Sequence, residues 1–205
     1  MKLSDYVMNH LASFGVRDVF LLPGGGCMHL VDSLGKHPQL RFICTLHEQG
    51  AAIAADAYAQ FTGHLGVALV TTGPGGTNAL TGVAAAWLDS TPCLILSGQV
   101  KRPDLRREGG PRQMGFQEVD IVSMVRPITK YAATVMDPRQ IRHHLEEALH
   151  LARSGRPGPV WIDIPLDVQA AEIDADNLEG FTPAAASSGP DPALDDAVEQ
   201  TVQRL

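Results

Sequence analysis

A glutamate at a strand-to-helix junction is the first residue whose type and place suggest chemistry. Glu48 follows an apolar, strand-like run at residues 40–46 and opens an alanine-rich, helix-like run at residues 48–61. In an open α/β sheet, such a junction lies at the carboxyl end of a strand, where ligands bind. The carboxylate either exchanges protons with a bound ligand or is a first-turn acid that the helix dipole stabilises by about 0.3–1 kcal/mol. The adjacent His47 is either a second proton carrier or a hydrogen-bonded structural side chain.

Two glycine-rich segments follow other strand-like runs. Pro23-Gly24-Gly25-Gly26 and Gly73-Pro74-Gly75-Gly76-Thr77-Asn78 let the backbone approach a ligand closely, or simply make tight turns. The first segment lacks the GxGxxG spacing of dinucleotide-binding sites, and the second lacks the Gly-Lys-Ser/Thr of a phosphate loop. Asn78 either reaches a ligand or caps the helix that follows.

A long polar loop at residues 98–115 precedes an aromatic and amide pair, Phe116 and Gln117. Gln117 offers both an amide donor and an acceptor, and Phe116 offers an aromatic wall. Glu118 and Asp120 are expected to be surface or capping residues. The loop either attracts an anionic substrate or is a solvated surface. Its basic residues are Lys101, Arg102, Arg106, Arg107 and Arg112.

The elements that must position these residues alternate along the chain. Short apolar runs predict strands at residues 19–22, 40–46, 66–72, 93–97, 128–135 and 159–164. Helical patterns lie between them, at residues 4–14, 28–34, 48–61, 77–88 and 138–152. This alternation predicts the α/β class, with a doubly wound, mostly parallel sheet that is flanked by helices on both faces.

Composition narrows the class of protein. The chain has 205 residues and a net charge of −7, which argues against a surface that coats nucleic acid and favours a cytoplasmic protein. The first residues lack the apolar core of a signal peptide, and no apolar run is long enough to span a membrane. Cys27, Cys44 and Cys93 show no metal-binding spacing, so we expect buried, reduced thiols and no metal site.

The last residues differ from the rest. We expect one domain at residues 1–172, a linker at residues 173–193 and the start of a truncated central domain at residues 194–205. Leu194, Val198, Val202 and Leu205 form the apolar stripe of a helix. Either this stripe meets a domain beyond residue 205, or the helix packs back on the sheet.

Taken together, the motifs resemble the amino-terminal, pyrimidine-binding domain of thiamine-diphosphate enzymes of the acetolactate synthase group. The matching segments occur in order over about residues 1–170. They are Phe20-Leu21-Leu22-Pro23-Gly24-Gly25, His47-Glu48-Gln49-Gly50-Ala51-Ala52, Thr71-Thr72-Gly73-Pro74-Gly75-Gly76-Thr77-Asn78, Leu88-Asp89-Ser90-Thr91-Pro92, Ser97-Gly98-Gln99-Val100, Phe116-Gln117-Glu118-Val119-Asp120, Arg126-Pro127-Ile128-Thr129-Lys130, Ser154-Gly155-Arg156-Pro157-Gly158-Pro159-Val160 and Asp163-Ile164-Pro165.

The resemblance implies a role for each matching residue. Glu48 would hydrogen-bond the ring nitrogen of the aminopyrimidine, favour its imino form and so help to activate the cofactor for attack on a 2-keto acid. The residues that would line the pyrimidine side are Pro23, Gly24, Gly25, Thr71, Gly73, Pro74 and Asn78. Phe116 and Gln117 would lie near the reacting carbon, with Gln117 as a second catalytic residue.

The resemblance also implies partners. The substrate would be a 2-keto acid such as pyruvate, and the protein would form a homodimer or homotetramer. Thiamine diphosphate would be bound with Mg²⁺ through a diphosphate-binding domain that this sequence does not contain, and some members carry FAD in a middle domain. In this family the active site lies between two chains, so this chain would provide half a site.

Three departures concern the substrate side. Leu22 stands where many members have Tyr, Met114-Gly115 replaces Asp-Ala, and Gly26-Cys27-Met28 differs from the usual sequence after two glycines. We therefore expect thiamine-diphosphate chemistry first, and acetolactate synthesis as one form of it. The alternatives are a split enzyme whose diphosphate-binding domain is a separate chain, and a non-catalytic dimerisation module.

Overall fold

The computed structural model describes residues 1–106, 109–183 and 192–204. Six strands form one sheet in which every neighbouring pair is parallel, in the order β2-β1-β3-β4-β6-β5. The strands are β1 (Asp18–Leu21), β2 (Arg41–Cys44), β3 (Gly66–Val70), β4 (Cys93–Gln99), β5 (Tyr131–Thr134) and β6 (Val160–Pro165). The predicted α/β sheet is confirmed, and all six expected strands are present.

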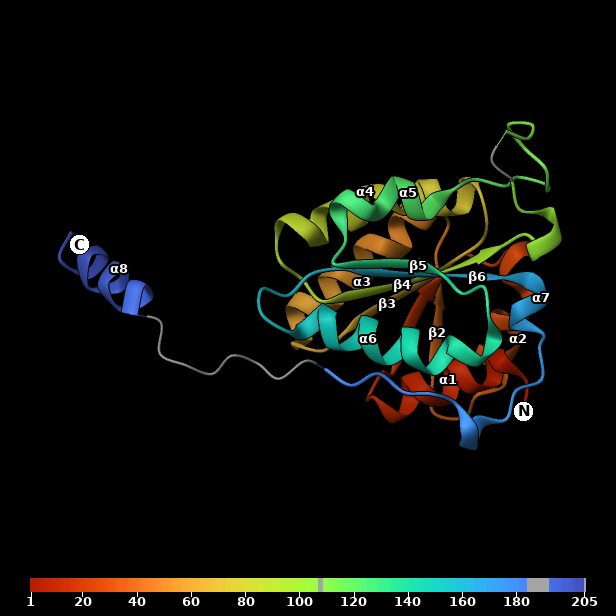
Figure 1. Ribbon diagram of the computed structural model, residues 1–205, viewed down its shortest axis with the longest axis horizontal. Helices are drawn as coiled ribbons and strands as arrows, with labels where there is room; N and C mark the ends of the chain where they lie inside the picture. Colours follow the sequence, from red (N-terminus) through yellow and green to blue (C-terminus); the bar gives the residue numbers. More distant parts are fainter. Residues whose placement is uncertain (107–108, 184–191, 205) are drawn as a thin grey trace.

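Helices cover both faces of this sheet (Figure 1). The α-helices are α1 (Leu3–Ser13), α2 (Met28–Lys36), α3 (Glu48–Thr62), α4 (Pro74–Leu88), α5 (Ile121–Val125), α6 (Ile141–Arg153), α7 (Leu166–Gln169) and α8 (Pro192–Val202). Short 3₁₀ turns join them: η1 (Gly25–Cys27), η2 (Arg102–Asp104), η3 (Arg126–Ile128), η4 (Pro138–Gln140) and η5 (Ala175–Asn177).

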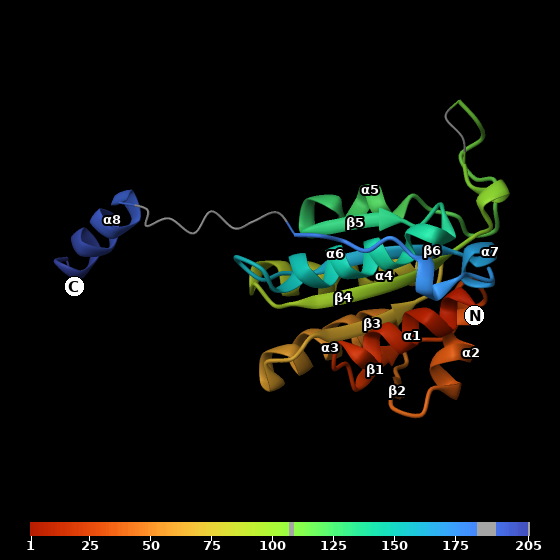
Figure 2. The same cartoon turned by 60° about the horizontal axis from the view of Figure 1, so that its bottom comes forward.

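The two helix layers enclose two separate parts of the core. Helices α4 and α5 lie above the sheet in Figure 1, α3 packs against α4, and their core contains Trp161. Helices α1, α2 and α6 lie below it, and Figure 2 shows α1 and α6 in front of the strands. Strands β3, β4 and β6 are buried along their whole length, as expected for parallel strands covered on both faces. No helix in the described part of the chain has both the length and the hydropathy that crossing a bilayer requires.

Strand β2 departs from the expected buried strand. It pairs only with β1 at the edge of the sheet, and its four residues are all exposed, including Cys44. The prediction of buried thiols is confirmed for Cys27 and Cys93 but is wrong for Cys44. The reason is position, because an edge strand has a neighbour on one side only.

Some element boundaries also differ from the pattern. Helix α4 begins at Pro74, three residues before the predicted start, because a proline at the first helical position needs no hydrogen-bond partner for its nitrogen. Asn78 therefore lies inside the helix and does not cap it. The short helices α5 and α7 were not predicted, because five and four residues are too few to show a period.

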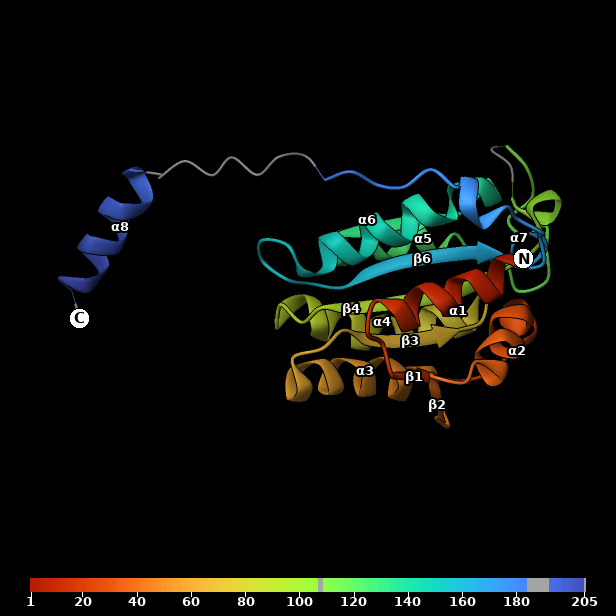
Figure 3. The same ribbon diagram turned by 90° about the horizontal axis from the view of Figure 1, so that it is seen from below.

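The segment after β6 packs against the domain. The amino group of Met1 donates to the carbonyl of Ile173, so the amino terminus lies beside this segment and α7 (Figure 3). Ile173 and Leu178, in the first half of the expected linker, are buried. Residues 184–191 of that linker lie outside the described residues, as does Leu205. In α8, the stripe residues Leu194, Val198 and Val202 are exposed.

Candidate functional site

The two glycine segments lie together at the carboxyl ends of the neighbouring strands β1 and β3. The chain leaves these two strands toward opposite faces of the sheet. Strand β1 leads to α2 below the sheet and β3 leads to α4 above it, which creates a crevice at their carboxyl ends. Across this crevice, the Gly26 amide donates to Thr71 Oγ1 at 3.0 Å. A Cβ atom at Gly24 would lie 2.5 Å from the Thr71 Cβ, so only glycine permits this approach.

Glu48 lies at this crevice as the first residue of α3. His47 is the N-cap residue of α3, and its Nδ1 atom accepts from the Gln49 amide. This is the hydrogen-bonded structural role that was one of the two alternatives for His47. Glu48 itself is only 6% exposed, although it is ionisable. Its Oε2 accepts from Asn78 Nδ2 at 2.9 Å, and its Oε1 would lie 3.4 Å from a Cβ atom placed at Gly75. The Glu48 carboxylate therefore lies against the turn at Gly73-Pro74-Gly75. The side-chain amide of Asn78 holds one of its oxygens, and the other oxygen lies near the backbone of Gly75.

The turn at Gly73 is packed against the segment that carries Gln117. Gly73 has φ +59° and Gln117 also has φ +59°, which is rare for a residue with a side chain. A Cβ atom at Gly73 would lie 2.0 Å from the Gln117 carbonyl oxygen. Backbone thus touches backbone at this point, and the structure brings together two segments that are more than 40 residues apart.

Replacing Gly73 with alanine is expected to destabilise the fold by about 1–3 kcal/mol, because the methyl group would overlap the Gln117 carbonyl and the backbone would be strained. Urea unfolding measures the change. Gly35→Ala is the matched control, since nothing lies within 4 Å of its Cβ position in α2, and we expect it to be neutral or stabilising. Equal stability of the two variants would contradict the close packing at Gly73.

The predicted substrate-side residues, Phe116 and Gln117, line a cavity next to the crevice. A cavity of about 280 Å³ is lined by Gly25, Phe116 and Gln117 together with Lys101 of the basic loop. The Phe116 side chain is 81% exposed and stands at the surface. Glu48 is not among the residues that line this cavity, so the predicted site residues fall into two adjacent groups joined at Gly73 and Gln117.

The other polar residues of the loop are largely engaged locally. Arg102 pairs with Asp167 at 2.7 Å, Glu118 accepts from the amides of Arg106 and Met114, and Asp120 caps α5. The predicted surface and capping roles of Glu118 and Asp120 are thus confirmed. Arg107 lies outside the described residues.

Sequence reasoning gave no role to a buried polar cluster beside this site, formed by Thr72, Gln99 and Asp163. Asp163 is 1% exposed and accepts from Ser97 Oγ at 2.5 Å, Gln99 Nε2 at 3.1 Å and Thr134 Oγ1 at 3.2 Å. Burial raises the pKa of Asp163 to about 7, although these three donors oppose the rise. The available signal was the presence of polar side chains at the ends of otherwise apolar strand runs.

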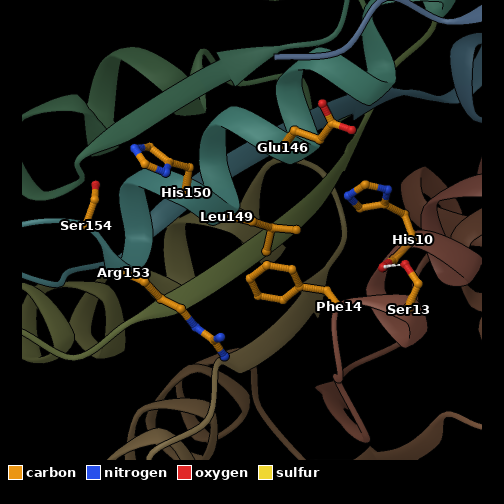
Figure 4. Close-up of a pocket in the computed structure, with 8 residues that line it drawn as sticks. All are labelled: His10, Ser13, Phe14, Glu146, Leu149, His150, Arg153 and Ser154. Carbon is orange, nitrogen blue, oxygen red and sulfur yellow. Dashed lines mark hydrogen bonds between the residues drawn. The ribbon is translucent and has the colours of Figure 1, made fainter. Parts of the chain in front are cut away.

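A larger cavity, about 640 Å³, lies away from these motifs, between α1 and α6 (Figure 4). Two of its charged side chains are engaged: Glu146 accepts from Arg142 and from the Phe181 amide, which lie outside the lining, and Arg153 stacks 4.6 Å from the centre of the Phe14 ring. Size alone does not make it the reactive site. Among the described residues, no group of three or more His, Cys, Asp or Glu side chains is placed to hold a metal ion.

Comparison with known proteins identifies the family of this domain. Residues 1–124, which include Glu48 and both glycine segments, match the family described as thiamine pyrophosphate enzyme, N-terminal TPP binding domain. The chain belongs to this family. The match ends just after α5 begins, so it covers the crevice between β1 and β3 and the segment with Phe116 and Gln117.

Curated relatives of this thiamine pyrophosphate enzyme domain extend the likeness further along the chain. Acetolactate synthase of Arthrospira platensis is 44% identical over 171 residues, which is 82% of this chain and 28% of the relative. The acetolactate synthase large subunit of Lactococcus lactis is 43% identical over 173 residues, or 83% and 28% of the two chains. The chloroplastic acetolactate synthase of Arabidopsis thaliana is 39% identical over 206 residues, covering 100% of this chain and 30% of its own. The chain thus spans under a third of the length of these relatives.

Proposed function

We propose that this chain is the pyrimidine-binding part of a thiamine-diphosphate-dependent 2-keto-acid decarboxylase or carboligase that resembles acetolactate synthase, with pyruvate as a substrate. The observation that carries the proposal is the buried Glu48 carboxylate, which lies against the Gly73–Asn78 turn in a domain of the thiamine pyrophosphate family. A carboxylate so enclosed exchanges a proton with a ring nitrogen more effectively than a solvated one.

The residues of the crevice suit a flat heterocycle. Gly24 and Gly75 pack so closely against the Thr71 side chain that neither could carry a side chain of its own, so backbone and Thr71 would form this wall of the crevice. Asn78 fixes one oxygen of Glu48, so the other oxygen is free to face the ring nitrogen. Pro23, Gly25 and Pro74 would form the rim of the pyrimidine site. Bound thiamine diphosphate would supply a carbon nucleophile and an electron sink for decarboxylation.

Phe116 and Gln117 are proposed to act on the substrate side. They line the 280 Å³ cavity together with Lys101, whose ammonium group suits a keto-acid carboxylate. Gln117 would donate its side-chain amide to a substrate oxygen, and its backbone contact with Gly73 ties this cavity to the Glu48 side.

The remaining half of the site would come from other domains. Mg²⁺ and the cofactor diphosphate would be held by a diphosphate-binding domain, and FAD by a middle domain in members that use it. An exposed apolar surface on α3 and α4 is available for such a contact, in a homodimer or homotetramer. It includes Ile53, Phe61, Trp87 and Leu88, which are 43%, 92%, 38% and 74% exposed. The cytoplasm remains the expected compartment, on the strength of the acidic composition.

Calorimetry tests this proposal. Thiamine diphosphate with Mg²⁺ is titrated into this chain, into a separately produced diphosphate-binding domain from a relative, and into their mixture. We expect measurable uptake only by the mixture, because the two halves hold different ends of the cofactor. No uptake by the mixture, when the two chains are shown to associate, would instead favour a non-catalytic dimerisation module.

A further inference from the structure

The side chain of Gln99 makes four hydrogen bonds, which connect it to its own strand and to three other segments of the chain. Its Oε1 accepts from Thr72 Oγ1 at 2.8 Å and from the Val100 amide at 3.0 Å. Its Nε2 donates to the Val119 carbonyl at 3.0 Å and to Asp163 Oδ2 at 3.1 Å. All the donors and acceptors of the amide are therefore used, and Gln99 is only 3% exposed.

These contacts reach both segments of the proposed site. Thr72 belongs to the turn at residues 71–75, which lies against Glu48, and Val119 belongs to the segment at residues 115–120, which carries Gln117. Gly73 and Gln117 are already in backbone contact. The contact itself contains no hydrogen bond that fixes its geometry, whereas Gln99 links both segments by directional bonds.

Asp163 holds Gln99 from the neighbouring strand β6. Its Oδ2 accepts from Gln99 and Thr134, and its Oδ1 accepts from Ser97, which in turn accepts from Trp161 Nε1 at 2.8 Å. Strands β4, β5 and β6 thus all contribute to one buried network. Such a network, when its members are satisfied, defines one arrangement of the segments attached to it.

We propose that Gln99 and Asp163 are positioning residues that hold the turn at residues 71–75 and the segment at residues 115–120 in fixed register. Under the proposed function, on which this inference rests, the turn packs against Glu48 of α3 and the segment at residues 115–120 carries Gln117. Glu48 is hydrogen-bonded to Asn78 and not to Gln99 or Asp163. Gln99 lines the 280 Å³ cavity beside Gln117, whereas Asp163 does not line it and acts through Gln99.

The charged groups that face Asp163 are few. A cavity of about 350 Å³ beside the network is lined by Asp163, Gln99 and Thr134, with Arg106, Glu118 and Asp120 among its other residues. Asp120, at the N-cap of α5, raises the pKa of Asp163 further by repulsion. Arg106 belongs to the basic loop at residues 98–115, and Glu118 to the segment at residues 115–120. Protonation of Asp163 therefore alters a hydrogen-bond network that has two acidic neighbours, Glu118 and Asp120, and one basic neighbour, Arg106, on the side of this cavity.

Hydrogen exchange on the 205-residue chain, without cofactor, tests the link. The probes are two pairs of hydrogen-bonded amides: Gly75 and Thr77 in the turn, and Glu118 and Ile121 beside Gln117. Thr72→Val keeps the shape of the side chain but removes its bond to Gln99, and we expect it to raise exchange about tenfold in both pairs. Thr72→Ser keeps the hydroxyl and should restore rates close to those of the unmodified chain.

Two results would overturn the proposal. If Glu118 and Ile121 exchange at unchanged rates in Thr72→Val, the segments are not linked through Gln99. If amides of the remote helix α6 accelerate equally, the network only stabilises the whole fold. Because no cofactor is present, either result leaves the calorimetric test of the proposed function unaffected.

A second measurement addresses Asp163 directly. The amide chemical shifts of Gly75 and Glu118 are expected to titrate together with a midpoint near the Asp163 pKa of about 7. Asp163→Asn should abolish this titration. Substitution of Asp137, a partly exposed residue after β5 that is paired with Arg139, by asparagine should leave it intact. Persistence of the titration in Asp163→Asn would contradict the assigned role.

Discussion

Replacing Glu48 with glutamine is expected to slow proton exchange at the reactive carbon of thiamine diphosphate by about 10²–10⁴-fold, the usual contribution of a positioned acid or base. Glutamine has the same shape and still accepts from Asn78 through its amide oxygen, so the crevice should keep its form. It cannot exchange a proton with a ring nitrogen. The measurement is cofactor proton exchange by NMR in the mixture of this chain with a diphosphate-binding domain.

The fold should tolerate this change. Glu48 lies in the first turn of α3, so loss of its charge there costs about 0.3–1 kcal/mol through the helix dipole. Glu172→Gln is the matched control, because Glu172 is 79% exposed and pairs with the amino terminus far from the crevice. Near-normal exchange in Glu48→Gln, with the control unchanged, would disprove the assignment of Glu48 as the proton-exchanging residue.

The second large effect concerns stability and pH. The pKa of buried Asp163 is raised to about 7 from its ordinary value of 3.8, because burial penalises the charged form. Between these two values the folded chain binds a proton that the unfolded chain has lost. The contribution of Asp163 to stability is therefore complete below pH 4, declines as the pH rises and is lost above pH 7.

Asp163→Asn should remove this dependence. The amide cannot ionise, and it can donate to Ser97 Oγ while its oxygen accepts from Gln99 and Thr134, as the protonated carboxyl does. Relative to the unmodified chain, the variant should gain about 3 kcal/mol in unfolding free energy between pH 5 and pH 8, at about 1.4 kcal/mol per pH unit below the folded pKa.

Urea unfolding at several pH values measures this difference. Asp137→Asn serves as the control, because its partner Arg139 holds the pKa of Asp137 down to about 2 and it does not titrate in this range. If unmodified chain and Asp163→Asn follow parallel stability curves from pH 5 to pH 8, Asp163 is ionised throughout and the buried network must hold a full charge.

Much of the fold could be predicted because its signals are local. Continuous apolar runs marked all six strands, and glycine at residue 63 marked the end of α3, where it has φ +71°. Glu48 was identified as a candidate because it stands at a strand-to-helix junction, and Asn78 because it follows a strand and a glycine segment. That Asn78 contacts Glu48 itself was not predicted, since they are 30 residues apart and belong to different helices.

The wrong prediction for Cys44 and the missing role for Gln99 and Asp163 have the same cause, which is the order of the strands in the sheet. Cys44 lies in a run as apolar as that of β3, yet it is exposed, because its strand is at the edge. Gln99 and Asp163 were quoted in matching motifs but were given no role, because β4 and β6 pair although β5 lies between them in sequence. No spacing along the chain shows that Ser97 faces Asp163.

The sequence by itself determined which segments become strands and helices, and that glycine segments and a carboxylate stand at their junctions. Hydrophobic periodicity and backbone freedom are properties of neighbouring residues, so they can be read without a structure. Only the tertiary structure decided which strand is at the edge, that Gly73 touches Gln117, and that Gln99 hydrogen-bonds to Thr72, Val119 and Asp163. These features depend on strand order and register, which are set by packing between residues distant in sequence.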